Sequence, residues 1–112
     1  MKKFFQKTIR GILYRPYCYN VWFQVLDNSE DKVLSENNND IAYICDEKIM
    51  HQGLKPNGTC GIFGHNKNKT IDVPYDSRKI SVEQIKNFLE NYGFKVKEIK
   101  NKLMKRFGEI QL

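Results

Sequence analysis

Residues 81–93 carry the clearest alternation of hydrophobic and polar positions in the chain. Apolar side chains recur there at intervals of three or four residues: Ile85, Phe88, Leu89 and Tyr92. This spacing predicts an amphipathic helix with one buried face. Ser81 and Gln84 stand at the positions of a capping box, and Gly93 can end the helix.

Alternation with a period of two predicts strands elsewhere. In residues 17–27, YCYNVWFQVLD, the residues that fall on one face are Tyr19, Val21, Phe23 and Val25. Asn20, Trp22 and Gln24 fall on the other face. TIDVP at residues 70–74 and FKVKEI at residues 94–99 are also predicted strands, and Pro74 is expected to end the first of these or confine it to a sheet edge.

Short apolar runs separated by turn-forming residues predict an antiparallel meander in the first half. KVLSE at residues 32–36 is a predicted short strand, IAYIC at 41–45 a strong one, and IMHQG at 49–53 its hairpin partner. The acidic residues of this region are then expected in solvated turns.

Helical spacing returns at both ends of the chain. Near the start it joins Phe5, Ile9, Ile12 and Leu13, with Pro16 as the stop. Near the end it joins Leu103, Met104 and Phe107. The first helix is expected to pack on the core, with an arm for a membrane surface or nucleic acid as the alternative.

Together these elements predict a single α+β domain over residues 1–112. The expected architecture is a mostly antiparallel sheet of about four to six strands with helices packed mainly on one face. It includes a C-terminal strand-helix-strand unit over residues 70–99. That unit is similar to half of a ferredoxin-like fold, which hosts too many functions to transfer one.

Composition favours a folded protein in a reducing compartment. The chain is 40% hydrophobic and contains seven Phe, six Tyr and one Trp, which argues against disorder. Three cysteines without a C-x-x-C pair do not suggest a disulfide framework. Polar residues interrupt the apolar run after the basic start, and no run approaches the roughly 18 apolar residues of a transmembrane helix. We therefore expect a bacterial-type cytoplasmic protein.

The formal charge of +6 is concentrated at the two ends, and the middle is acidic. A positive surface attracts nucleic acid or acidic partners. Lysine greatly outnumbers arginine and asparagine is abundant, so AT-rich coding bias is an alternative source of this charge.

The best candidate for metal chemistry is the spacing C-x5-H-x8-C-x4-H formed by Cys45, His51, Cys60 and His65. Structural zinc sites usually take their ligands in closer pairs, so packing and loop roles are favoured and no metal is expected. A Cys60 nucleophile beside either histidine matches no known signature. A phosphate cradle at Gly58, Gly61 and Gly64 lacks the following helix.

With no catalytic or cofactor motif, we expect no enzyme and no cofactor. The favoured function is a small protein-binding module, such as a bacterial inhibitor or immunity protein acting by surface complementarity. The alternative is a basic RNA- or DNA-binding domain in which Tyr17, Tyr19 or Trp22 stacks on unpaired bases. Its expected contacts are Lys2, Lys3, Lys7, Arg10, Arg15, Lys97, Lys100, Lys102, Lys105 and Arg106. The sequence does not predict the oligomeric state.

Overall fold

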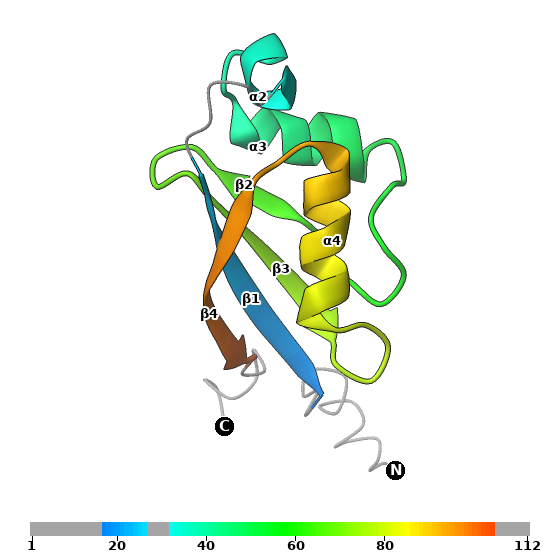
Figure 1. The fold of residues 1–112 in the computed structure, drawn as a ribbon. Coiled ribbons are helices and arrows are strands. Elements are labelled where there is room, and N and C mark those ends of the chain that lie inside the picture. Colours follow the sequence, from blue (N-terminus) through cyan, green and yellow to red (C-terminus); the bar gives the residue numbers. More distant parts are fainter. Residues whose placement is uncertain (1–16, 27–31, 105–112) are drawn as a thin grey trace, which may run out of the picture.

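A computed structural model describes residues 17–26 and 32–104, and in this part of the chain four strands form one antiparallel sheet (Figure 1). The strands are β1 (Cys18–Val25), β2 (Phe63–His65), β3 (Thr70–Asp76) and β4 (Val96–Leu103). The helical segments are α2 (Lys32–Glu36), α3 (Ile41–Tyr43), the π-helix η1 (Ile44–Met50) and α4 (Val82–Tyr92). The protein is α+β, as expected.

The sheet has the order β2-β3-β1-β4, so β1 lies between β3 and β4. Both neighbours run antiparallel to β1 and therefore parallel to each other. The expected strand-helix-strand unit is matched in part, because its two strands do not touch. Along the chain, β1 is followed by the helical region α2–η1, the strands β2 and β3, the helix α4 and the strand β4. This order of elements corresponds to the split β-α-β arrangement of ferredoxin-like folds.

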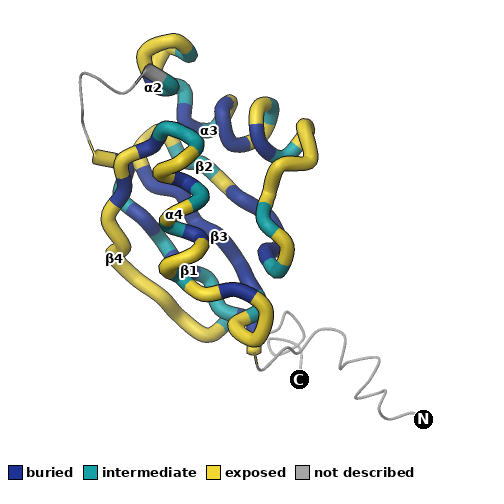
Figure 2. The backbone as a smooth tube through the Cα atoms, turned by 45° about the vertical axis from the view of Figure 1, so that its right-hand side comes forward, coloured by how far each residue is buried: buried dark blue, intermediate teal, exposed yellow. Residues whose placement is uncertain are grey.

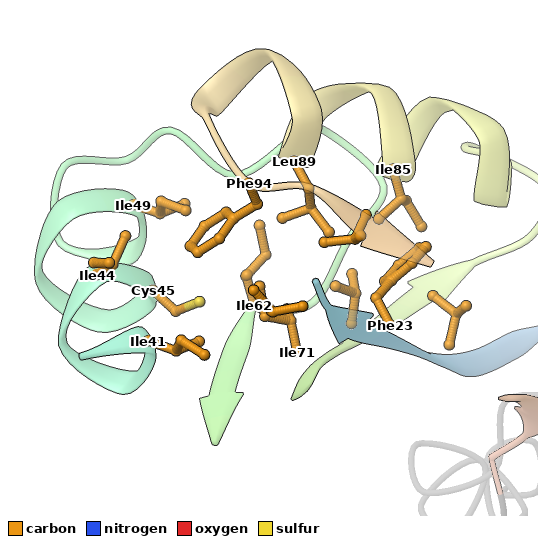
Figure 3. Close-up of a cluster of buried hydrophobic side chains, with 14 of the residues drawn as sticks. Phe23, Ile41, Ile44, Cys45, Ile49, Ile62, Ile71, Ile85, Leu89 and Phe94 are labelled. Carbon is orange, nitrogen blue, oxygen red and sulfur yellow. The ribbon is translucent and has the colours of Figure 1, made fainter. Parts of the chain in front are cut away.

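A hydrophobic core lies between the sheet and its helices (Figure 3). Ile85 and Leu89 of α4 are fully buried there against Val21 and Phe23 of β1. Burying one such side chain contributes roughly 1.5–3 kcal/mol. We call the sheet face under α4 the core face and the opposite one the outer face.

The capping signals of α4 are confirmed. The Ser81 hydroxyl accepts the backbone N–H of Gln84 at 3.1 Å, and the Gln84 side chain accepts the backbone N–H of Ser81 at 2.9 Å. Gly93 ends the helix with φ +131°, and a Cβ there would lie 2.3 Å from Val33. Glycine is therefore required by both the backbone angle and the close approach of α2.

The predicted meander in residues 32–53 is wrong, because this region is helical. IAYIC and the residues after it form α3 and η1, with Asp40 accepting the backbone N–H of Tyr43 at 3.0 Å as the N-cap. The buried residues of the segment are Ile41, Ile44, Cys45 and Ile49. Their spacing of three, one and four residues is that of a helix face, and a run of five apolar residues cannot by itself distinguish a strand from a buried helix.

KVLSE is likewise α2 and not a strand. The asparagines after it end the helix, since Asn38 and Asn39 both adopt positive φ and the N–H of Asn39 donates to the carbonyl of Leu34 at 2.7 Å. Asparagine is one of the few residues besides glycine that tolerates this conformation. The acidic residues Asp46 and Glu47 therefore lie on a helix and not in the expected turn.

Pro74 neither ends β3 nor lies on an edge, contrary to expectation. It is buried inside a central strand, where it pairs with Asn20 of β1. Its carbonyl accepts the N–H of Cys60 at 2.7 Å. In a strand, the N–H and the C=O of one residue point to the same side, so the nitrogen of Pro74 faces Cys60 and not β1. On that side β2 has already ended, so the N–H that proline lacks removes no hydrogen bond from the sheet.

The expected helical spacing at Leu103 and Met104 is also wrong within the described residues. β4 continues to Leu103, and the N–H of Met104 donates to the carbonyl of Cys18 at 2.9 Å. Figure 2 shows β4 exposed along most of its length, whereas β3 is buried. The predicted helix around Phe5–Leu13, and Phe107, lie outside the described residues.

Candidate functional site

An open groove of about 610 Å³ lies between the α3–η1 segment and β2. Its lining includes three carboxylates, Asp40, Asp46 and Glu47, and two aromatic rings, Tyr43 and Phe63. Tyr43 is 44% and Phe63 45% exposed, so both rings reach solvent. The groove therefore combines negative charge with accessible aromatic surface.

Close backbone contact holds the two walls of this groove together. A Cβ on Gly64 of β2 would lie 2.6 Å from the carbonyl oxygen of Ile41, so only glycine lets α3 approach so near. The Asn66 side chain accepts the N–H of Ala42 at 3.1 Å and donates to Asp40 at 2.8 Å. These contacts fix α3 against the β2–β3 hairpin, and the groove is preformed.

The Asp40 carboxylate is held in its charged form. Hydrogen bonds from the Asn66 side chain and from the Tyr43 backbone hold the pKa of Asp40 below the usual range of an aspartate. It therefore keeps its negative charge under mildly acidic conditions.

Beside the groove, Asp46, Glu47 and His51 place their ligand atoms within 4.8 Å of one another, and among the described residues they form the one such group of three. Glu47 and His51 contact each other at 2.9 Å one helical turn apart. All three lie on the surface of one short helical segment, where such contacts are ordinary. Asp46 and Glu47 are the same carboxylates that line the groove, so this group brings only the His51 ring to its border.

A second cluster occupies the outer face of the sheet. His65 Nε2 lies 2.5 Å from Asp72 Oδ1, and the Asn20 side chain donates to Asp72 Oδ2 at 3.1 Å. The Trp22 ring stacks on His65 with centroids 5.3 Å apart, and Lys100 Nζ lies 4.9 Å from the Trp22 ring centre. The cluster joins all four strands of the sheet.

The predicted metal and nucleophile residues do not come together. Cys45 is buried in the core, Cys60 and His51 are exposed, and His65 is engaged with Asp72. Burial, with the charges of Asp72 and Asp46, raises the pKa of the Cys45 thiol to about 12. A thiol with that pKa is a poor nucleophile and a poor metal ligand at neutral pH.

Three of the predicted nucleic-acid contacts fall within the described residues. Lys97, Lys100 and Lys102 lie opposite Gln24, Trp22 and Asn20 in the pairing of β4 with β1. Paired residues share a sheet face, so all three lysines project from the outer face. The other predicted contacts lie outside the described residues: Lys2, Lys3, Lys7, Arg10, Arg15, Lys105 and Arg106.

The sequence reasoning missed the role of Asp72 and the groove. Alternation within β1 did place Asn20, Trp22 and Gln24 together on one face. The partners of that face come from β2, β3 and β4, and the register that joins them is a property of the folded sheet.

Comparison with protein-family models, with curated proteins and with solved structures finds no significant match to this chain. Among the helices of the described segments, none has the length and apolar character needed to cross a membrane.

Proposed function

We propose that this chain is a small non-enzymatic protein-binding module, of the inhibitor or immunity type, that acts by surface complementarity. The observation that supports this most directly is the preformed groove lined by three carboxylates and two exposed aromatic rings. Aromatic side chains in or beside a groove are frequent anchors of protein interfaces.

The chemistry of the groove defines the partner it suits. A volume of about 610 Å³ accommodates a few side chains and is typical of ligand-sized clefts. The carboxylates of Asp46 and Glu47 would pair with a lysine or arginine, while Tyr43 and Phe63 would cover an apolar neighbour. We therefore propose a partner segment with a basic residue next to an apolar one.

The two walls of the groove support this proposal, because they are already ordered before a partner binds. The Gly64–Ile41 approach and the Asn66–Asp40 hydrogen bond hold the groove without a ligand. A site that is already formed loses less conformational entropy on binding than one that must order itself.

Selection from a random peptide display library tests the proposal. Peptides with a basic residue beside an apolar one should be enriched, and Phe63→Ala should weaken their binding roughly tenfold or more. The double variant D46N/E47Q should weaken binding strongly and reduce its salt dependence. The matched control E83Q/E90Q removes the same charge from α4, away from the groove, and should bind like the parent.

Two results would refute the groove as the binding site. One is a selection that enriches no basic peptides. The other is equal loss of binding in D46N/E47Q and in E83Q/E90Q, which would show that net charge and not the groove is recognised.

A further inference from the structure

The outer face of β1 and β4 carries a cluster of aromatic and basic side chains that the proposed function of the groove does not use. Its centre is the stacked pair of Trp22 and His65, with ring centroids 5.3 Å apart and an interplanar angle of 24°. The His65 side chain is 42% exposed, so the pair presents aromatic surface to solvent. Aromatic rings on an open sheet face are stacking surfaces for flat ligands.

Hydrogen bonds behind the rings hold this pair in place. His65 is bonded through Nε2 to Asp72, whose side chain is only 12% exposed, and Asp72 in turn accepts a hydrogen bond from Asn20. The imidazole is therefore oriented by a second layer of contacts. A ligand that stacks on the pair would meet an ordered surface.

Positive charge lies along one side of the stacked pair. Lys97, Lys100 and Lys102 share the outer face of β4, and Lys100 reaches over the Trp22 ring at 4.9 Å. Glu98, the acidic residue of β4, lies opposite Phe23 and so belongs to the core face. The charged side chains on the outer side of this strand are therefore all lysines.

Lysine on an edge strand also discourages pairing with other chains. That role requires no neighbouring aromatic surface, whereas here Lys100 contacts Trp22. Lys100 and Lys102 are two residues apart, a separation of about 6.6 Å along a strand, which suits successive phosphates of an extended chain. A row of cations beside a stacking surface matches a polyanion whose flat rings are not already stacked on one another.

We propose that the outer face of β1 and β4 binds an unpaired nucleic-acid strand without sequence preference, with bases stacked on Trp22 and His65 and phosphates on Lys97, Lys100 and Lys102. An unpaired strand fits better than a duplex, because the bases of a duplex are already stacked and a flat sheet face has no helix to enter a groove. Lysines act here as point charges and give little base discrimination. The carboxylates of the groove confine the strand to the β1–β4 side.

The single tryptophan of the chain makes this inference directly measurable. Titration with 12-nucleotide oligothymidylate at low salt should quench Trp22 fluorescence, and a 12-base-pair DNA duplex should bind more weakly. Three phosphate contacts predict a log–log salt slope of about 2, from roughly 0.7 per contact on single strands.

A lysine variant and a tryptophan variant separate the contribution of the positive charge from that of base stacking. K100Q/K102Q should lower the salt slope by about 1.4, from roughly 0.7 for each of two contacts. The matched control K79Q/K86Q removes the same charge outside the outer face and should retain the slope. Trp22→Leu, followed by anisotropy of a labelled oligonucleotide, should lose roughly tenfold or more in affinity.

Three outcomes would overturn the proposal. They are absence of quenching at low salt, equal slopes in the two lysine variants, and equal binding of a polyglutamate peptide, which would indicate an acidic protein partner.

Urea midpoints of all variants confirm that each is folded. D46N/E47Q should bind the oligonucleotide at least as well as the parent, so failure of the groove proposal is distinguishable from failure of this one.

Discussion

The two borders of the sheet, at the edge strands β2 and β4, carry opposite charge. Beside β2, the groove collects Asp40, Asp46 and Glu47. Along β4, the outer face carries only lysines among its charged groups: Lys97, Lys100 and Lys102. The two regions meet at His65, which lines the groove and stacks on Trp22.

The groove and the basic border depend on different kinds of contact, so different mutations should disturb them. The basic border follows from alternation along one strand and its register with β1. The groove depends on contacts between segments far apart in the chain, such as Asp40 with Asn66. We therefore expect the groove to be sensitive to packing changes that leave the basic border intact.

Phe94→Ala should have the largest effect. Phe94 is 1% exposed and lies between Leu89 and Ile49, where η1 packs against the end of α4 (Figure 3). Removing a buried ring costs roughly 3–5 kcal/mol, measurable by urea unfolding. Leu54→Ala, at a residue that is 47% exposed, is the control and should change the stability by less than about 0.5 kcal/mol. A small effect of Phe94→Ala would contradict the packing of the groove wall.

Thiol labelling compares the groove wall with the surface directly. Cys60 is exposed, whereas Cys45 lies in η1, 1% exposed with a pKa of about 12. Iodoacetamide at neutral pH should alkylate Cys60 faster than Cys45 by on the order of a hundredfold or more. Mass spectrometry of digested samples follows the two sites. Comparable rates would mean that η1 opens readily.

Gly64→Ala should disturb the groove by a smaller amount. The new Cβ would meet the Ile41 carbonyl at 2.6 Å and push α3 away from β2, at a cost of roughly 1–3 kcal/mol. Alkylation of Cys45 should become faster, while oligonucleotide binding at the basic border stays unchanged. Gly53→Ala is the control, since a Cβ there meets nothing within 4 Å and only its φ of +70° is strained. If both variants accelerate Cys45 labelling equally, the close approach is not what holds the wall.

Asp40→Asn should have the smallest effect, and its size depends on pH. The pKa of Asp40 is lowered in the folded protein, so its charge stabilises the fold above the unfolded value near 3.8. This contribution is lost as the pH falls through the lowered pKa. Thermal unfolding of parent and variant should therefore differ at pH 7 and converge in strong acid. A difference that grows on acidification would contradict the hydrogen bonds assigned to this carboxylate.

Local signals predicted α4 and most of the strands β1, β3 and β4 correctly. Ser81, Gln84 and Gly93 marked both ends of α4, and alternation marked β1, β3 and the start of β4. These signals depend on neighbours within one or two turns or on one strand face, so they are visible without the tertiary structure. The placement of three lysines on the face of Trp22 needed the register of β4 against β1.

Residues 32–53, where the predicted strands are helices, show the limit of such signals. IAYIC is equally compatible with a buried strand and a buried helix, and its β-branched residues favoured the wrong choice. Asp40 as an N-cap, and the spacing of Ile41, Ile44, Cys45 and Ile49, would have identified the helix. The three-residue strand β2 was also missed, because so short a segment forms only against the β3 backbone.

The sequence by itself determined the α+β class, the amphipathic helix α4, the outward face of β1 and the separation of basic and acidic residues along the chain. Only the tertiary structure decided that residues 41–50 form a wall beside β2, that Asp72 orients His65, and that the acidic and basic borders lie at opposite edges of one sheet. The reason is physical. Periodicity and capping are set by residues a few positions apart, whereas the groove and the stacked pair arise from contacts between segments whose proximity is created only when the sheet closes around β1.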